Sequence, residues 1–167
     1  MGEATPVETT AQRVSEFLEG AGVSRVSPTV FAARRGSAVV AVEVFPWEED
    51  EGPGDAIVEV RANVVSGALP TLDLLRQLME YNASADFGAF GIEEGGMITF
   101  HHCLVGSNLS RKVLHEVVRE VAAVADDWDD IIVEQVGGKT AVDLLSELRQ
   151  PKLRPTIEAP RQAPGEA

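Results

Sequence analysis

The chain has 167 residues, and at 44% hydrophobic it holds enough apolar material for the core of a single domain. A formal net charge of −13 would repel a phosphate backbone and an anionic lipid surface, which argues against nucleic acid and membranes as partners. The single cysteine, Cys103, excludes an intrachain disulfide, and the lack of a signal-like start or a membrane-length apolar run predicts a cytoplasmic protein.

The N-terminal residues predict a leader followed by an amphipathic helix. Residues 1–8 show no apolar periodicity and are expected to be disordered. Thr9 and Gln12 match a capping box, and Gly22 is expected to end the helix. The apolar residues between them follow the i, i+3, i+4, i+7 spacing: Val14, Phe17, Leu18 and Ala21. This single apolar face must pack on another element, which we expect to be a sheet.

The first strands of that sheet are predicted to form a hairpin. Residues 29–34 and 38–45 flank the turn Arg35-Gly36-Ser37. The second strand alternates Val40, Val42 and Val44 with smaller or polar residues, and Pro46 is expected to end it.

A third strand is predicted after the strongly acidic loop 47–55. It covers residues 56–65, with Glu59, Arg61 and Asn63 on its outer side. The inward side is apolar: Val58, Val60, Ala62 and Val64.

A second helix and a second hairpin follow. Thr71 can cap the helix and Asp73 suits its positive N-terminus. Its predicted face contains Leu75, Leu78, Met79 and Asn82. Residues 87–92 are expected to be extended, 94–96 to form a turn, and 97–105 to form the partner strand.

The longest helix is predicted over residues 110–135. One apolar stripe runs along it: Leu114, Val117, Val118, Val121, Val124, Ala125, Trp128, Ile131 and Ile132. Gly137 and Gly138 end it, and a short closing helix follows before a proline-rich tail, 151–167, that is expected to be disordered. The order α-β-β-β-α-β-β-α predicts an α+β domain over 9–150, an antiparallel five-stranded sheet covered by helices.

The second helix, the segment Phe87-Gly88-Ala89-Phe90-Gly91, the acidic glycine turn, the strand through His102 and the run 125–130 resemble the YbjN-like domain proteins. That family is related in fold to type III secretion chaperones of the CesT kind, and its actinobacterial members are described as peptide-binding and chaperone-like. The resemblance covers about residues 30–145, and it implies a fold and a protein-binding role without any reactive group.

The sequence His101-His102-Cys103 is the group most suggestive of a metal site. On a strand, His101 and Cys103 point to the same side and could bind a soft metal such as zinc. A zinc site needs three or four ligands, but His115 is the one other imidazole, and no CxxC or HxxxH spacing is present. We therefore predict no metal and no cofactor, and interpret these residues as partly buried strand positions.

Two further motifs have plain structural interpretations. Asp126, Asp127, Asp129 and Asp130 flank Trp128 on a continuous helix rather than in a calcium-binding loop, so we expect a solvated acidic face with Trp128 in the core. Gly138-Lys139-Thr140 resembles the end of a phosphate-binding loop, but Val133 stands where that motif needs glycine.

Two aromatic residues are candidates for partner binding. Trp47 lies beside the acidic loop, where it is either packed under the loop or exposed to a partner. Phe87 lies between helix and hairpin, where it either closes the helix end or contacts a partner.

No catalytic constellation is present, so the sequence predicts a non-enzymatic, chaperone-like or regulatory module that recognises a protein or peptide segment. Its acidity favours basic partners, and a homodimer is a further possibility. The alternatives are a scaffold or signalling regulator acting in a fixed complex, and a small-ligand or metal-binding module centred on His101 and Cys103.

Overall fold

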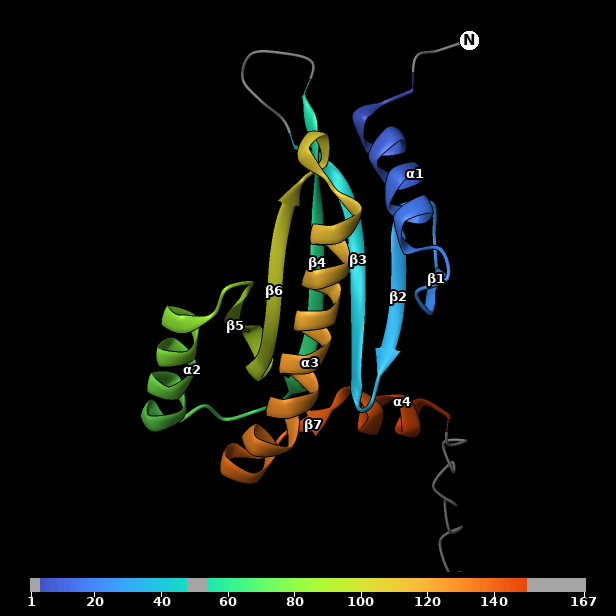
Figure 1. Cartoon of the computed structure of the whole chain (residues 1–167). Helices are drawn as coiled ribbons and strands as arrows, with labels where there is room; N and C mark the ends of the chain where they lie inside the picture. Colours follow the sequence, from blue (N-terminus) through green and yellow to red (C-terminus); the bar gives the residue numbers. More distant parts are fainter. Residues whose placement is uncertain (1–3, 48–53, 150–167) are drawn as a thin grey trace, which may run out of the picture.

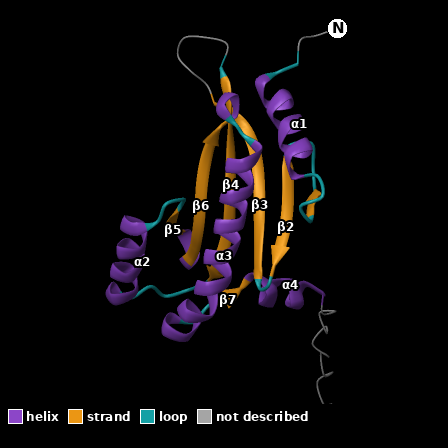
Figure 2. Ribbon diagram, in the orientation of Figure 1, coloured by secondary structure: helices purple, strands orange, loops and turns teal. Residues whose placement is uncertain are grey.

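The computed structural model describes residues 4–47 and 54–149 (Figures 1 and 2). Residues 48–53 of the acidic loop and the predicted tail, 151–167, lie outside the described residues. The elements in chain order are α1 (Pro6–Leu18), β1 (Val23–Arg25), β2 (Val30–Arg35), β3 (Ala38–Trp47), β4 (Asp55–Ser66), α2 (Leu72–Ser84), β5 (Ala89–Glu93), the 3-10 turn η1 (Glu94–Gly96), β6 (Met97–Val105), the 3-10 turn η2 (Gly106–Asn108), α3 (Arg111–Val136), β7 (Lys139–Thr140) and α4 (Ala141–Arg149).

The strands form one antiparallel sheet with the order β1-β2-β3-β4-β6-β5, and β7 pairs with the end of β4. This mixed arrangement of helices and antiparallel sheet confirms the predicted α+β class. The described part of the chain has seven strands rather than the predicted five. The two additional strands, β1 and β7, have three and two residues, which is too short to show an apolar alternation.

Helices α1 and α3 cover one face of the sheet, and Figure 1 shows α3 lying along its central strands. The inward side of β4 is buried as predicted, and a bulge near Asn63 and Val65 buries Val65 in addition to Val64. The buried residues of α3 follow the predicted stripe: Leu114, Val117, Val121, Val124, Ala125 and Ile132. Ile131 was wrongly included in that stripe, since it is 43% exposed.

Helix α1 begins earlier than the sequence predicted. Its capping residue is Thr5, which accepts a hydrogen bond from the Glu8 N–H while the Glu8 carboxylate accepts one from the Thr5 N–H at 2.8 Å. Pro6 suits the first helical position because it has no N–H to leave unpaired there. Thr9 therefore lies within the helix, and residues 6–8 are helical rather than part of a leader.

Strand β3 continues through Pro46, which was wrongly expected to end it. The Val44 N–H points toward the β2 side and donates to the Thr29 carbonyl at 2.9 Å. The Pro46 nitrogen points to the same side two residues later, beyond the last β2 pair, Val30 with Glu43. No ladder partner is lost there, so proline is tolerated while Pro46 still pairs with Ala56 of β4.

Helix α2 is capped by Thr71 as predicted, but its buried face is rotated from the predicted one. Leu74 and Leu78 are buried, whereas Met79 is 60% exposed. The reason is that α2 packs against β5, where Tyr81 lies edge to face with Phe90, Phe100 and Trp128. Trp128, which was predicted to be core, is partly buried and packs against the core.

Candidate functional site

The sheet face opposite α1 and α3 has partly exposed and exposed residues along β3, β4 and β6, and we call it the open face. It is formed by alternate residues of β3, β4 and β6, which lie in register across the three strands. Among the described helices, α4 packs against this face, at the end where β3 begins (Figure 1). Along β3 the open face has three regions, two apolar ends and a polar middle.

The first row is apolar. Phe45 of β3 pairs with Ile57 of β4, which in turn pairs with Val105 of β6. Trp47 follows Phe45 on the same side of β3. Phe45 is 37% exposed and Trp47 is 41% exposed, so both keep much of their aromatic surface in water.

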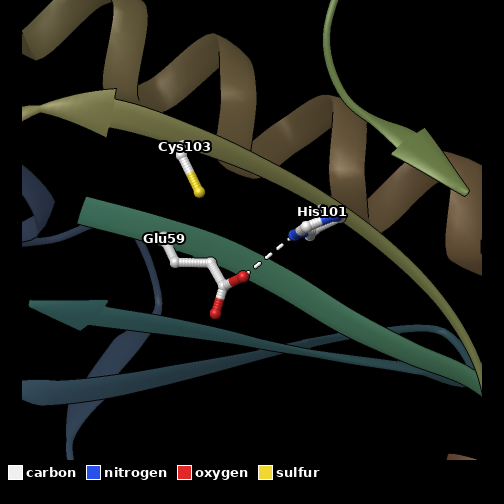
Figure 3. A group of neighbouring side chains, drawn as sticks. All are labelled: Glu59, His101 and Cys103. Carbon is white, nitrogen blue, oxygen red and sulfur yellow. Dashed lines mark hydrogen bonds and ion pairs between the residues drawn. The ribbon is translucent and has the colours of Figure 1, made fainter. Parts of the chain in front are cut away.

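The middle of the open face is polar. Glu59 of β4 lies opposite Cys103 of β6, and His101 lies two residues before Cys103 on the same side. The His101 Nδ1 atom is 2.9 Å from the Glu59 Oε1 atom (Figure 3). Burial and the negative charge of Glu59 raise the pKa of the Cys103 thiol, although the residue as a whole is exposed.

The expectation that His101 and Cys103 share one side of a strand is confirmed, and Glu59, which the sequence did not suggest as a ligand, lies beside them. His115, the other imidazole considered, lies on α3 and its Nε2 atom is 2.6 Å from the Phe17 carbonyl oxygen. Glu59 is 42 residues from His101, and only the β4–β6 register brings them together. The sequence contained one indication that Glu59 could join this group, namely its expected position on the outer side of its strand.

The third region is an apolar groove between α4 and the sheet. It has a volume of about 360 Å³ and is lined by Val39, Ala41, Arg61, Asn63, Leu144 and Leu145. The Arg61 guanidinium is bound by Glu93 at 2.6 Å and by Asn63 at 3.3 Å, so its charge is turned to the groove's edge. The open face therefore has apolar surface at both ends.

Phe87 lies away from Trp47, because β4 and β6 separate β3 from β5. It is half-buried on the connector before β5 and stacks edge to face on His102, with ring centroids 5.8 Å apart. The Gly88 N–H donates to the His102 Nδ1 atom at 3.1 Å. Burial and the neighbouring His101 lower the pKa of His102, so this ring is a neutral structural acceptor at physiological pH.

The aspartates near Trp128 do not form the solvated face that the sequence predicted. Asp129 is buried at 1% exposure, and burial raises the pKa of its carboxyl group. Asp126 accepts hydrogen bonds from Ser37 in the β2–β3 turn. Asp126 therefore connects α3 to the β2–β3 hairpin and Asp129 is buried, while Asp127 and Asp130 are exposed.

The phosphate-loop resemblance at Gly138-Lys139-Thr140 has no structural support. Lys139 and Thr140 form β7, and the Lys139 Nζ atom pairs with the Glu147 carboxylate at 2.6 Å. None of the helices in the described ranges is long and apolar enough to cross a lipid bilayer.

Comparison with solved structures identifies the fold. A chain in the structure titled "Crystal Structure of the ExsC-ExsE Complex" matches with a TM-score of 0.56 and 13% sequence identity, over 77% of this chain and 97% of that chain. At this identity the likeness concerns the fold alone. No protein of curated function matches the sequence significantly.

A sheet covered by helices on one face, with exposed aromatic residues on the other, is suited to binding a protein segment. The family model described as "T3SS (YopN, CesT) and YbjN peptide-binding chaperone 1" matches residues 6–144. The chain belongs to this family, TY-Chap1, and the resemblance to YbjN-like proteins and secretion chaperones is confirmed.

Proposed function

We propose that this protein is a non-enzymatic, chaperone-like module that holds a protein segment against the open face of its sheet. The observation that carries the proposal is the exposed aromatic pair Phe45 and Trp47 at the end of β3. Aromatic side chains that keep apolar area in water recover about 25 cal/mol per Å² when a partner covers them. Tryptophan is also among the residues most enriched in binding hot spots.

The spacing of the apolar regions sets the size of the segment. From Val39 in the groove under α4 to Trp47, β3 advances by eight residues, or about 27 Å at roughly 3.4 Å per residue. An extended segment of about eight residues therefore reaches both apolar ends of the open face. Glu43, exposed between them, favours a basic residue at the centre of that segment.

The edges of the sheet offer a second contact. β1 and β5 end the strand order, and an added strand would pair through the backbone groups of such an edge. On β5 the Asn82 side chain already binds the N–H and the carbonyl of Phe90, so a strand added there would have to displace Asn82. Phe87 directly precedes β5 and would contact a segment added there. The free thiol of Cys103 is compatible with a reducing compartment, and we place the protein in the cytoplasm.

The second candidate function is a scaffold or regulator in a fixed complex, which includes a homodimer. It is favoured by apolar residues on the outer side of α2, where Leu72, Leu75 and Met79 are exposed at helical spacing. This helix face and the open face belong to different elements, so substitutions can separate the two functions.

The test uses peptides selected from a random library by binding to the purified chain, with affinities measured by fluorescence anisotropy. Trp47→Ala should weaken binding by about 2 kcal/mol, roughly thirtyfold, while the free energy of unfolding changes little. Leu72→Ala is the matched control, because it removes another exposed apolar side chain without touching the sheet.

Unchanged affinity in Trp47→Ala with a loss in Leu72→Ala would move the partner to α2 and support the fixed complex. If apolar contacts dominate, raising the salt concentration should cost only a small part of the affinity, since screening acts on charges. Stabilisation of an otherwise unstable partner protein would indicate chaperoning rather than scaffolding.

A further inference from the structure

Three side chains with metal-binding atoms converge in the middle of the open face. Glu59, His101 and Cys103 each offer one such atom, and all three atoms lie within 4.8 Å of one another. Figure 3 shows the three side chains directed toward a common point, Glu59 from β4 and the other two from β6. All three residues lie in the β4–β6 ladder, in which Glu59 pairs with Cys103 and Arg61 pairs with His101, so this register sets their backbone positions.

We infer that Glu59, His101 and Cys103 form a binding site for a thiophilic divalent transition metal, of which Zn²⁺ is the best fit. A thiolate with an imidazole selects against Mg²⁺ and Ca²⁺, which prefer oxygen ligands only. Zinc bonds of about 2.0 to 2.3 Å place tetrahedral ligand atoms about 3.5 Å apart. The three atoms are at most 4.8 Å apart, so each has to shift by about 1 Å or less to reach that geometry, a distance within the range of side-chain rotation.

The charges around the site favour a cation. Glu43 of β3 and Glu59 of β4 lie directly opposite each other in the register, and like charges in this position destabilise an antiparallel pair. Arg61, the nearest arginine on β4, already has its guanidinium bound by Glu93 and Asn63. A divalent ion between an ionised Glu59 and the Cys103 thiolate gives an assembly of zero net charge. The Cys103 thiol transfers its proton to solvent as the sulfur–metal bond forms.

Three protein ligands leave a fourth tetrahedral position, and the exposure of Cys103 puts that position in contact with solvent. A water molecule fills such a position in open zinc sites. Because the site lies between the two apolar ends of the open face, a side chain of a bound segment could replace that water. Metal binding goes beyond the proposed peptide-binding function and does not depend on it.

The site is tested by titrating the purified full chain, without an affinity tag, with Co²⁺ as a spectroscopic substitute for Zn²⁺. We expect one ion per chain, a near-ultraviolet thiolate-to-cobalt charge-transfer band and displacement of the ion by Zn²⁺. Cys103→Ser should abolish the band. Glu59→Gln and His101→Gln should each weaken binding by at least about tenfold.

His115→Gln is the matched control, since His115 lies on α3 away from the open face and its substitution should leave the band intact. A thermal melt of each variant checks that it is folded. Absence of the band in the parent, or an unchanged affinity in Glu59→Gln, would overturn the site.

A second measurement needs no variant. Zn²⁺ should slow alkylation of the single thiol by iodoacetamide severalfold. An unchanged rate in the presence of saturating Zn²⁺ would equally overturn the proposal.

Discussion

The Asp126 carboxylate on α3 accepts two hydrogen bonds from Ser37, one from its backbone N–H and one from its hydroxyl, both at 2.7 Å. The two residues are 89 positions apart, and their contact joins the longest helix to the β2–β3 turn. Gly36, with φ of +55°, allows this approach, because a Cβ atom there would overlap the Asp126 carboxylate.

Replacing Asp126 by asparagine should lower the free energy of unfolding by about 1 kcal/mol, because a neutral amide is a weaker acceptor for the Ser37 donors. Asp127→Asn, at an exposed neighbouring position, is the control and should shift stability by less than about 0.5 kcal/mol. Urea unfolding at neutral pH measures both. Equal effects would mean that the contact with Ser37 adds nothing to stability.

The same contact predicts a pH dependence. The hydrogen bonds from Ser37 lower the pKa of Asp126 in the folded state. Because the folded pKa lies below the unfolded one, this stabilisation is complete above the unfolded value of about 3.9 and is lost as the pH falls through the folded pKa. The stability of Ser37→Ala should therefore fall less steeply than that of the parent below about pH 4. Parallel curves in acid titrations of stability would contradict this linkage.

Two adjacent isoleucines on α3 test the position of its core face. Ile132 is fully buried and Ile131 is 43% exposed. Ile132→Ala should cost about 2 to 5 kcal/mol of unfolding free energy, since it removes buried contacts and leaves a cavity. Ile131→Ala should cost less than about 1 kcal/mol. Denaturant unfolding of the two variants measures the difference. A larger loss for Ile131→Ala than for Ile132→Ala would show that the buried face of α3 is assigned wrongly.

Alanine substitutions at Gly88 and Gly67 distinguish the cost of backbone strain from the cost of steric overlap. Both have positive φ, +83° and +72°, but a Cβ on Gly88 would lie 2.7 Å from Phe100 whereas nothing lies within 4 Å at Gly67. Gly67→Ala should cost about 1 to 2 kcal/mol, the ordinary penalty for a left-handed residue. Gly88→Ala should cost a further 1 to about 3 kcal/mol for overpacking, because Phe100 belongs to the core. Matching losses in thermal or urea unfolding would show that Phe100 can move aside.

The domain boundaries give a further prediction. Deleting residues 151–167, which carry four prolines and no apolar periodicity, should change the unfolding free energy by less than about 1 kcal/mol. A deletion that also removes α4, residues 141–167, should cost more because it removes Leu144 and Leu145 from the groove on the open face. Calorimetry of both truncations compares them, and a large loss in the shorter deletion would show that the tail is docked.

The sequence alone determined the features that depend on local periodicity and local hydrogen bonds. The apolar stripe of α3 and the alternation of β4 follow directly from the spacing of apolar residues, because burial selects one side of a helix or strand. The cap at Thr71 was also predictable, since its hydroxyl reaches the Leu74 N–H within one turn. The family, too, was recognisable from the sequence, because its features lie along one continuous stretch.

Tertiary structure decided everything that depends on which distant residues meet. Glu59 joins His101 and Cys103 only through the register of β4 with β6, and Asp126 meets Ser37 only because α3 packs over the β2–β3 turn. The rotated face of α2 has the same origin, since several leucines fit a helical spacing and the position of β5 selects which are buried. Periodicity specifies that a face is apolar, whereas long-range packing sets the register and therefore the composition of a site.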